Sequence, residues 1–523
     1  MLIVPRRHLR PASALLATCA LALPLALGAS AVVAPAAAAT ATVTSRCLDS
    51  VPEPGSREPV KICVSVFKPA GASAKRRVPI LLEGHGWAGS RRSQPADVKR
   101  WTDAGYGVIS IDQRGFGQSG GVSHVMNPAF EGADLRRVVR YAASLPWVRK
   151  DAPGDPRMGA IGGSYGGGYQ FLAAFELMRV RGKPVLDALA PQITWNDLNE
   201  SLAPRSAVRT LWALVLSGAA LASEALPPEI YKALVEGAAT GTWPDGSIPG
   251  TEDLPAFFDR NGPSWHVRQG RRLRIPVLMG QGTTDSLFNL EQGLRNWRTA
   301  LTPLARKRSV FIGYNGGHVL PAVFPAGQSA TSDPCSRRLG GGSYDDLALR
   351  FFDRHLKGTA GAIPGRGKVH IGTTSGQCLT AATKLGRATK AYAVGTVATT
   401  TAAGPPVAVP IARGPIKLSG SAHLTATVTA LGVDNRAFYG LGVGPSPLNA
   451  RLVQNNMMPL RELQPVTGAK RRIELPAVGV SVPAGQTLYV IASAISDTSA
   501  GFGSRVPGVV LLEDVVAHLP VVR

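Results

Sequence analysis

The sequence has few charged residues and, in particular, few acidic ones. Charged residues make up 17% of its 523 positions, and 34 Asp and Glu stand against 57 Lys and Arg, a formal net charge of +23. Hydrophobic residues make up 45%, enough to fill packed cores, which excludes a wholly disordered chain. The basic residues are spread along the chain, without a dense cluster between aromatics and without a recognition-helix motif. We therefore expect no nucleic-acid partner, and a solvated basic surface with weak attraction to anionic cell-wall polymers.

Long apolar runs are confined to residues 1–39. Three arginines precede an apolar stretch that begins at Ala14, and the alanines at 36–39 offer cleavage sites, which is typical of a secretory signal peptide. An uncleaved signal anchor is the alternative, and the choice between general and twin-arginine export stays open. From Thr40 onwards no apolar run is long enough to cross a membrane. Removal of the three arginines leaves a net charge of +20, and we expect a secreted protein without an integral membrane span.

Cysteine is scarce, and four of the five residues follow the predicted signal: Cys47, Cys63, Cys335 and Cys378. An even number in an exported chain favours disulfides, and four cysteines allow three pairings. We favour Cys47–Cys63, because the segment between them is rich in turn formers and could close a hairpin. Cys335–Cys378 then follows by elimination. None of the spacings is that of a zinc site, and we expect neither a metal nor a cofactor.

The pattern of apolar segments divides the rest of the chain. Apolar strand-like runs alternate with helical segments over 40–191 and again over 271–360, which predicts a mostly parallel sheet covered by helices on both faces. The alternation stops over 192–270, where helical segments predict a cap inserted beside the sheet edge. Over 361–523 short strand-like segments separated by turn residues indicate an all-β sandwich.

Residues 162–166 read Gly-Gly-Ser-Tyr-Gly, directly after a predicted strand and directly before a predicted helix. A sharp strand-to-helix turn holds the serine in a strained conformation above the sheet, and the glycines relieve the crowding. A free hydroxyl is a poor nucleophile and needs a base. We predict that Ser164 is a catalytic nucleophile, the alternative being a structural Gly-Ser turn, and that an acid and then a histidine follow it along the chain.

Two later residues fit these partner roles. Asp285 lies in the loop that leaves the predicted strand over 275–279, and His318 lies in a glycine-rich loop after the next strand. Loops that leave parallel strands meet at the active edge of the sheet. The sequence therefore predicts Asp285 as the acid and His318 as the base. The alternatives are an Asx-turn residue and an ordinary surface histidine.

An oxyanion hole needs two donors about 3 Å from the charged oxygen. We expect the backbone N–H of Tyr165 to be one, and the N–H of Trp87, in the glycine-rich loop after residue 82, to be the other. An aminopeptidase would also need a carboxylate to hold the terminal ammonium of its substrate. Glu200 is the candidate for that role, the alternative being a solvated helix face.

Four segments and the C-terminal part carry a resemblance to a known family. The segments are Gly84-His85-Gly86, residues 112–119, residues 163–167 and residues 351–358. They resemble α/β-hydrolases of the X-Pro dipeptidyl-peptidase and cocaine-esterase-like acyl-esterase group. The β-rich tail is similar to the jelly-roll domain that ends those proteins. The resemblance implies an α/β-hydrolase fold with a helical cap and a C-terminal jelly-roll sandwich.

The resemblance also implies roles for single residues. By position Ser164, Asp285 and His318 match nucleophile, acid and base. Members of the group use a tyrosine hydroxyl as an oxyanion donor where this chain has Trp87, so a backbone donor is favoured here.

We expect an exported serine hydrolase that cleaves ester or amide bonds through an acyl-enzyme, with a small acyl ester preferred as substrate. An X-Pro dipeptidyl-peptidase or tripeptidyl aminopeptidase acting on a short peptide is the first alternative. A surface or glycan-binding protein with a non-catalytic hydrolase domain is the second.

Overall fold

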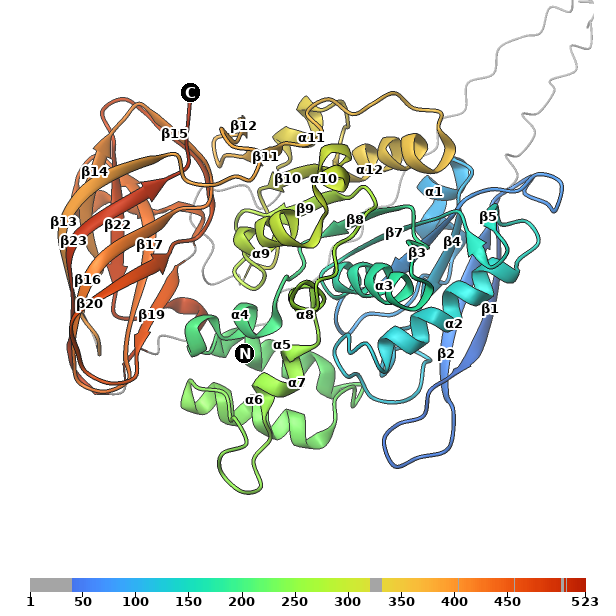
Figure 1. Cartoon of the computed structure of the whole chain (residues 1–523), viewed down its shortest axis with the longest axis horizontal. Helices are drawn as coiled ribbons and strands as arrows, with labels where there is room; N and C mark the ends of the chain where they lie inside the picture. The colour runs from blue at the N-terminus through green and yellow to red at the C-terminus, as the bar shows by residue number, and fades with distance from the viewer. Residues whose placement is uncertain (1–39, 320–331, 403, 456, 500–502, 505) are drawn as a thin grey trace, which may run out of the picture. The chain divides into compact units, whose positions relative to one another are not determined.

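The computed structural model, drawn in Figure 1, describes residues 40–319, 332–402, 404–455, 457–499, 503–504 and 506–523. The predicted signal peptide, residues 1–39, lies outside this part of the chain. Among the described residues no helix combines the length and apolar character that a bilayer crossing requires.

A ten-stranded sheet forms the first part of the fold, in the order β1-β2-β4-β3-β7-β8-β9-β10-β11-β12. Strands β4 to β11 of this order run parallel to one another, and β1, β2 and β12 pair in antiparallel fashion at its edges. The strands are β1 Thr42–Ser50, β2 Val60–Lys68, β3 Ile80–Gly84, β4 Gly107–Ile111, β7 Met158–Gly163, β8 Ala188–Gln192, β9 Leu278–Gly282, β10 Val310–Tyr314, β11 Val369–Gly372 and β12 Cys378–Thr380. A small separate hairpin joins β5 (Lys150–Ala152) to β6 (Asp155–Pro156).

Helices cover both faces of this sheet. Successive residues of a strand point to opposite faces, so each face has its own set of apolar side chains to bury. Ile80 and Leu82 of β3 pack in one core cluster with α2 and α3, whereas Leu81 packs in another with α1 and α12. Both faces are apolar, so the inner strands are continuous apolar runs. The covering helices are α1 Lys99–Asp103, α2 Glu131–Ser144, α3 Tyr165–Arg181, α9 Leu290–Arg295, α10 Pro303–Arg308, α11 Pro334–Arg338 and α12 Tyr344–Phe352.

The segment between β8 and β9 forms the helical cap. Its helices are α4 Leu198–Leu202, α5 Thr210–Leu221, α6 Pro228–Thr240, α7 Leu254–Asp259 and α8 Pro263–Arg268. Helices α5 and α6 pack on one another, and Figure 1 shows α4 to α7 grouped together in green. These helices form an insertion between two strands of the large sheet.

The C-terminal part is an antiparallel β-sandwich, as the sequence predicts. One sheet has the order β13-β23-β16-β20 and a second has the order β14-β22-β17-β18, with β19 paired to β17; a third holds β21-β15-β24. Inward-facing residues alternate with outward-facing ones along β16, and its buried side chains share one apolar core with those of the other sheets. The strands are β13 Lys390–Thr400, β14 Val407–Arg413, β15 Ile416–Gly420, β16 His423–Leu431, β17 Asn435–Gly444, β18 Arg451–Leu452, β19 Met458–Glu462, β20 Val466–Glu474, β21 Val478–Val482, β22 Thr487–Ser493, β23 Val509–Leu519 and β24 Val521–Val522.

The large sheet runs further along the chain than the expected boundary after residue 360. Strands β11 and β12 belong to it, so it ends at Thr380, and the strands of the sandwich begin at Lys390. Short strands at a sheet edge carry the same local pattern as sandwich strands, and only their pairing partners distinguish them.

Two disulfides link elements at the edges of the large sheet. Cys47 pairs with Cys63, directly opposite it on β1 and β2, and Cys335 of α11 pairs with Cys378 of β12. This is the pairing that the sequence favours. Disulfides persist in oxidising compartments, so both bonds are compatible with an extracellular location.

Arginine side chains of the sandwich donate hydrogen bonds to the cap. Arg436 of β17 donates to the carbonyl of Gly241 at 2.9 Å and to the hydroxyl of Thr242 at 3.0 Å, just after α6. Arg461 of β19 donates to the same hydroxyl at 2.9 Å. Asp434 pairs with both guanidinium groups at 2.6 Å. These contacts fix the C-terminal end of α6 against the sandwich.

Candidate active site

Ser164 lies at the turn between β7 and α3, in a backbone conformation that non-glycine residues rarely adopt, with φ 55° and ψ −121°. The neighbouring glycines make the turn possible. A Cβ added at Gly166 would lie 2.0 Å from the carbonyl oxygen of Gly84, and one added at Gly162 would lie 2.5 Å from the same oxygen. Only glycine fits at either position, so the serine hydroxyl is held at the end of the sheet by a strained and closely packed turn.

The three residues predicted as a triad lie within hydrogen-bonding distance of one another. His318 Nε2 is 2.8 Å from Ser164 Oγ, and His318 Nδ1 is 2.8 Å from Asp285 Oδ2. The carboxylate of Asp285 is fully buried, whereas 16% of the His318 side chain is exposed. Serine, imidazole and carboxylate therefore form one continuous chain that begins at the strained turn.

The surroundings of Asp285 fix the direction of its carboxylate. Its Oδ1 accepts the backbone N–H of Leu287 at 3.0 Å and that of Phe288 at 2.7 Å, which leaves Oδ2 facing the imidazole. The backbone N–H of Ser286 donates to the carbonyl of His318 at 3.0 Å, joining the two loops. The sequence alone suggested an Asx turn as the alternative for this aspartate; the bonds to Leu287 and Phe288 are of that local kind and serve to orient it.

The imidazole of His318 is packed between aromatic rings. Phe288 and Trp212 both meet it edge to face, with ring centroids 5.2 Å and 5.9 Å away. Trp212, on α5, also donates its indole N–H to the hydroxyl of Ser286 at 3.1 Å. The cap helix α5 therefore reaches the loop that carries Asp285 and packs against the imidazole of His318.

The loop after β3 lies beside Ser164 and is shaped by His85. Its ring Nδ1 is 2.7 Å from the carbonyl of Gly86, and its Nε2 is 3.1 Å from the backbone N of Gln113, which donates to it. Burial lowers the pKa of His85, so the ring is neutral and its Nδ1 carries the proton donated to Gly86. His85 therefore organises the loop that follows β3.

The residues predicted to form the oxyanion hole lie beside this loop. The indole N–H of Trp87 donates to the carbonyl of Leu216 in α5 at 2.9 Å, so the side-chain donor is already used and only the backbone N–H of Trp87 is left for an oxyanion. Tyr165 is the first residue of α3, where backbone N–H groups have no partner within the helix. The hydroxyl of Tyr165 shares a 2.8 Å hydrogen bond with Ser123, so it too is committed elsewhere.

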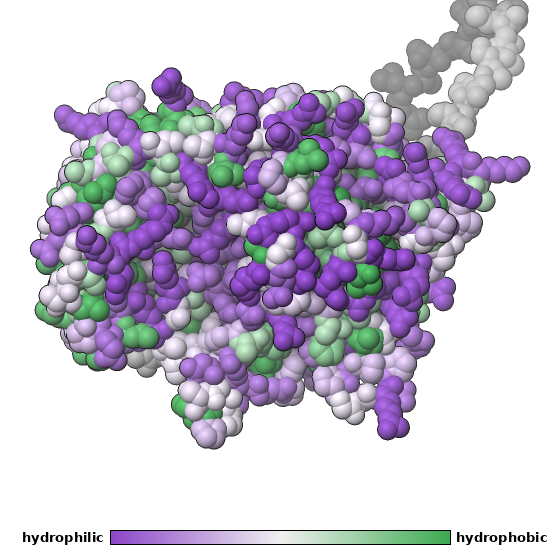
Figure 2. All heavy atoms as spheres, in the orientation of Figure 1, coloured by the Kyte–Doolittle hydropathy of each residue, from purple (hydrophilic) through white to green (hydrophobic). Residues whose placement is uncertain are grey.

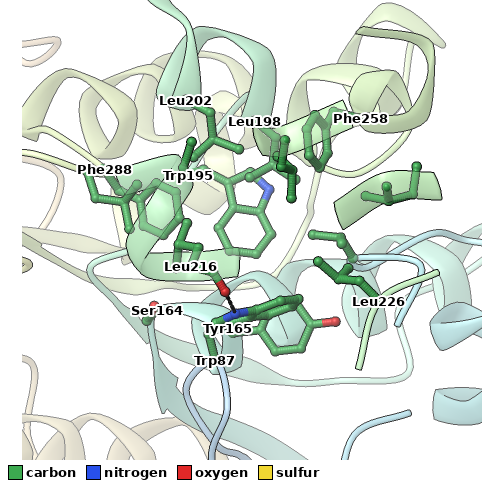
Figure 3. A pocket seen from close by; sticks show the side chains of 15 residues that line it. Trp87, Ser164, Tyr165, Trp195, Leu198, Leu202, Leu216, Leu226, Phe258 and Phe288 are labelled. Atoms are coloured by element: carbon green, nitrogen blue, oxygen red, sulfur yellow. Dashed lines mark hydrogen bonds between the residues drawn. The ribbon is translucent and has the colours of Figure 1, made fainter. Parts of the chain in front are cut away.

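A pocket opens next to Ser164. Figure 3 shows Ser164 on one side of it and Leu226 and Phe258 across the cavity. Apart from Ser164, the lining side chains are apolar or aromatic, and most come from the cap: Trp87, Val125, Tyr165, Trp195, Leu198, Leu202, Ala213, Leu216, Leu226, Ile230, Leu234, Phe258, Leu287 and Phe288. The described residues therefore form an apolar pocket beside Ser164, and its lining carries no charged group.

Glu200 does not line this pocket. Its carboxylate lies 3.9 Å from Arg295, which in turn pairs with Glu474 of β20 at the seam between α9 and the sandwich. The carboxylate of Glu200 therefore lies beside Arg295 and outside the lining of this pocket. Among the described residues no group of three or more His, Cys, Asp or Glu is arranged to hold a metal ion.

The apolar lining is the part of the site that sequence reasoning missed. The cap contains no motif, and its leucines read as ordinary core positions at helical spacing. The local signal is three pairs of lining residues at helical spacing, and such pairs occur on any amphipathic helix: Leu198 and Leu202 on α4, Ala213 and Leu216 on α5, and Ile230 and Leu234 on α6.

Comparison with known proteins identifies one family and several solved structures of similar fold. The family model described as X-Pro dipeptidyl-peptidase (S15 family) matches residues 58–319, half of the chain. A curated relative, an uncharacterized 31.7 kDa protein from Escherichia coli, is 33% identical over 104 residues, which is 20% of this chain and 35% of that protein. The chain thus spans about a third of the length of the curated relatives it matches.

Three solved structures are similar over nearly the whole chain. A CocE/NonD family hydrolase from Staphylococcus aureus has 14% identity and a TM-score of 0.59, with 92% of this chain and 94% of that chain covered. An aminopeptidase from a marine sediment archaeon, Thaumarchaeota archaeon, has 14% identity and a TM-score of 0.61, with 92% and 96% covered. An α-amino acid ester hydrolase has 14% identity and a TM-score of 0.56, with 93% and 98% covered. At these identities the likeness is one of fold, and it includes both the hydrolase sheet and the C-terminal sandwich.

Proposed function

We propose a function from the premise that this chain belongs to the X-Pro dipeptidyl-peptidase (S15) family and is a serine hydrolase. Its catalytic triad is Ser164, His318 and Asp285. It cleaves esters with an apolar acyl group. The observation that carries the proposal is the pair of 2.8 Å contacts from the two nitrogens of His318 to Ser164 Oγ and Asp285 Oδ2. The order along the chain, serine, then acid, then histidine, is that of α/β-hydrolases.

The reaction follows from these positions. His318 Nε2 takes the proton of Ser164 as Oγ attacks the carbonyl carbon, and the backbone N–H groups of Tyr165 and Trp87 receive the negative charge on the carbonyl oxygen. His318 then gives the proton to the leaving alcohol, and the acyl group stays on Ser164. Water, deprotonated by the same imidazole, releases the acid. Asp285 keeps Nδ1 protonated and stabilises the imidazolium.

The lining of the pocket supports the preference for an ester. An apolar acyl chain gains free energy by leaving water, and the side chains of the cap beside Ser164 provide an apolar surface for it. A peptide with a free amino end would bring an ammonium group into the same space. A buried ammonium needs a charged partner, and the described lining residues carry none.

The second candidate is an X-Pro dipeptidyl-peptidase or tripeptidyl aminopeptidase, which the family description favours. It requires a carboxylate near Ser164, and the predicted one, Glu200, pairs with Arg295 instead. The third candidate is a surface or glycan-binding protein with an inactive hydrolase domain. The contacts among the triad residues speak against it, because a binding module has no need of them.

We also propose that the protein works outside the cytoplasm. The pattern of residues 1–39 and the two disulfides support export, and the net charge of +20 that remains favours weak association with anionic cell-wall polymers.

Two assays test the proposed function. A fluorophosphonate probe should label the wild-type protein and should not label Ser164→Ala. The wild type should hydrolyse p-nitrophenyl butyrate and leave a dipeptidyl-proline anilide intact. Labelling of Ser164→Ala would exclude this serine as nucleophile, and cleavage of the anilide alone, with a need for a free amine, would replace the ester preference by the peptidase.

A further inference from the structure

Helix α5 of the cap carries no charged and no amide side chain along its whole length, Thr210–Leu221. The residues that it exposes to solvent are apolar or glycine. Three of them are large: Leu214, Val215 and Leu221 are 45%, 47% and 61% exposed. A helix on the surface of a soluble protein normally carries polar residues opposite its buried stripe. We name these three residues the cap apolar face.

The cap exposes further apolar side chains. Val235 on α6, which packs on α5, is 53% exposed, and Ile248 in the loop after α6 is 63% exposed. In Figure 2, green and white residues gather on the lower projection of the molecule, which is the loop after α6 in Figure 1. Exposed apolar patches of this kind mark interaction sites.

The inner side of α5 belongs to the active site. Ala213 and Leu216 line the pocket beside Ser164, one residue before and one residue after the exposed pair Leu214 and Val215. One helix, apolar on both sides, therefore separates the acyl pocket from the surroundings. Exposure of its outer side to water is unfavourable, whereas contact with an apolar phase would be favourable for both sides.

The charge of the cap points to the kind of surface that fits. Residues 192–270 contain nine Asp and Glu against five Lys and Arg, although the chain as a whole is strongly basic. An anionic membrane would attract the basic remainder of the protein and repel the cap. An uncharged apolar surface has no such conflict, because the cap apolar face itself bears no charge.

We propose that the cap apolar face docks on the surface of aggregated uncharged esters, so that the enzyme takes its acyl substrate from a lipid phase. This proposal rests on the proposed function, since it assigns the source of the ester that Ser164 attacks. Docking would bring the outer side of α5 into contact with the phase that supplies the chain for the pocket on its inner side.

Binding is tested with a protein that cannot hydrolyse the lipid. Ser164→Ala is mixed with dispersed tributyrin droplets, and the fraction that floats with them is measured. We expect the parent Ser164→Ala to float and the variant that adds Leu214→Ser, Val215→Ser and Leu221→Ser to partition at least tenfold less. The control adds Leu448→Ser instead, at a residue of the sandwich that is 98% exposed, and should float like the parent.

A single change, Leu221→Ser, guards against misfolding of the triple variant. It should lower partition by a smaller factor while the circular dichroism and melting temperature stay those of the parent. Absence of floating by the parent, or equal floating of the triple variant and the Leu448→Ser control, would overturn the proposal. So would floating with phosphatidylglycerol vesicles but not with tributyrin, since that assigns the binding to charge.

Activity separates this proposal from the function on which it rests. The wild type should hydrolyse tributyrin faster above the solubility limit of tributyrin, where droplets form. The triple variant should lose this increase in rate, as judged against its own rate on dissolved p-nitrophenyl butyrate. A wild type without activity on either ester contradicts the proposed function. Floating of the Ser164→Ala protein does not depend on that activity and decides the docking by itself.

Discussion

The loops at the end of the sheet and the cap that covers them are built by different physical effects. In the loops, close backbone approach and hydrogen bonds fix the conformation. Gly166 packs against the carbonyl of Gly84, and two backbone N–H groups donate to Asp285. In the cap the pocket is shaped by apolar side chains on several helices, which interact without direction. The difference teaches that the geometry around Ser164 is narrowly constrained, whereas the shape of the pocket beside it can change by small changes of side-chain volume.

The largest expected effect is at the acid, on the side of the loops. Asp285→Asn should lower kcat by about 10⁴-fold, because the amide no longer holds the imidazole in the productive tautomer. The loss should be the same for p-nitrophenyl acetate and octanoate, as measured by initial rates. Asp253→Asn is the matched control: Asp253 caps α7 in the cap, asparagine caps a helix equally well, and its rates should stay at the wild-type level. A variant Asp285→Asn with more than a tenth of the wild-type kcat would remove Asp285 from the triad.

An intermediate effect is expected in the cap, and only for long chains. Leu226 lies across the pocket from Ser164, so Leu226→Trp should fill the end of the cavity. We expect kcat/KM for p-nitrophenyl octanoate to fall about 30-fold, a loss typical of a crowded apolar subsite, with little change for the acetate. Leu304→Trp, at a position of α10 that is 67% exposed, should alter neither rate. Equal losses on both esters would mean that this cavity does not hold the acyl chain.

The smallest expected effect is at the contact between the two regions. Trp87→Phe keeps an aromatic ring but removes the indole N–H that binds the carbonyl of Leu216. The loss of one such hydrogen bond corresponds to about 1 kcal/mol, hence to about a fivefold lower kcat if the bond positions the backbone donor of this loop. The change should appear in kcat for the acetate and the octanoate alike, with the melting temperature lowered by no more than a few degrees. A rise of KM with kcat intact would instead show that Trp87 contributes only the shape of the pocket.

The same division decides what the sequence could predict. The turn around Ser164 was predictable because its requirements are local: a strand, glycines and a helix within a few residues. The proximity of Asp285 and His318 to Ser164 was predictable because each follows a strand, and the loops that leave parallel strands meet at one edge of the sheet. The sheet, the cap and the sandwich were predictable from the period of their apolar residues.

The lining of the pocket and the position of Glu200 were not predictable in this way. The pocket combines residues from four cap helices, and no local pattern says which leucines face Ser164 rather than a neighbouring helix. Glu200 lies beside Arg295, which pairs in turn with Glu474, and both of these residues are distant from it along the chain. The end of the large sheet at Thr380 is of the same kind, since β12 is recognised by its partner β11 and not by its residues.

The arginine contacts between the sandwich and the end of α6 have a consequence for the division of labour along the chain. Arg436 and Arg461 contact the end of the helix hairpin α5–α6, whose inner side lines the pocket beside Ser164. A shortened protein that ended after β12 would keep Ser164, Asp285 and His318 and lose these contacts. On the proposed function we therefore expect the sandwich to influence which acyl groups the pocket accepts, and we expect its exchange between relatives to alter selectivity while the nucleophile stays the same.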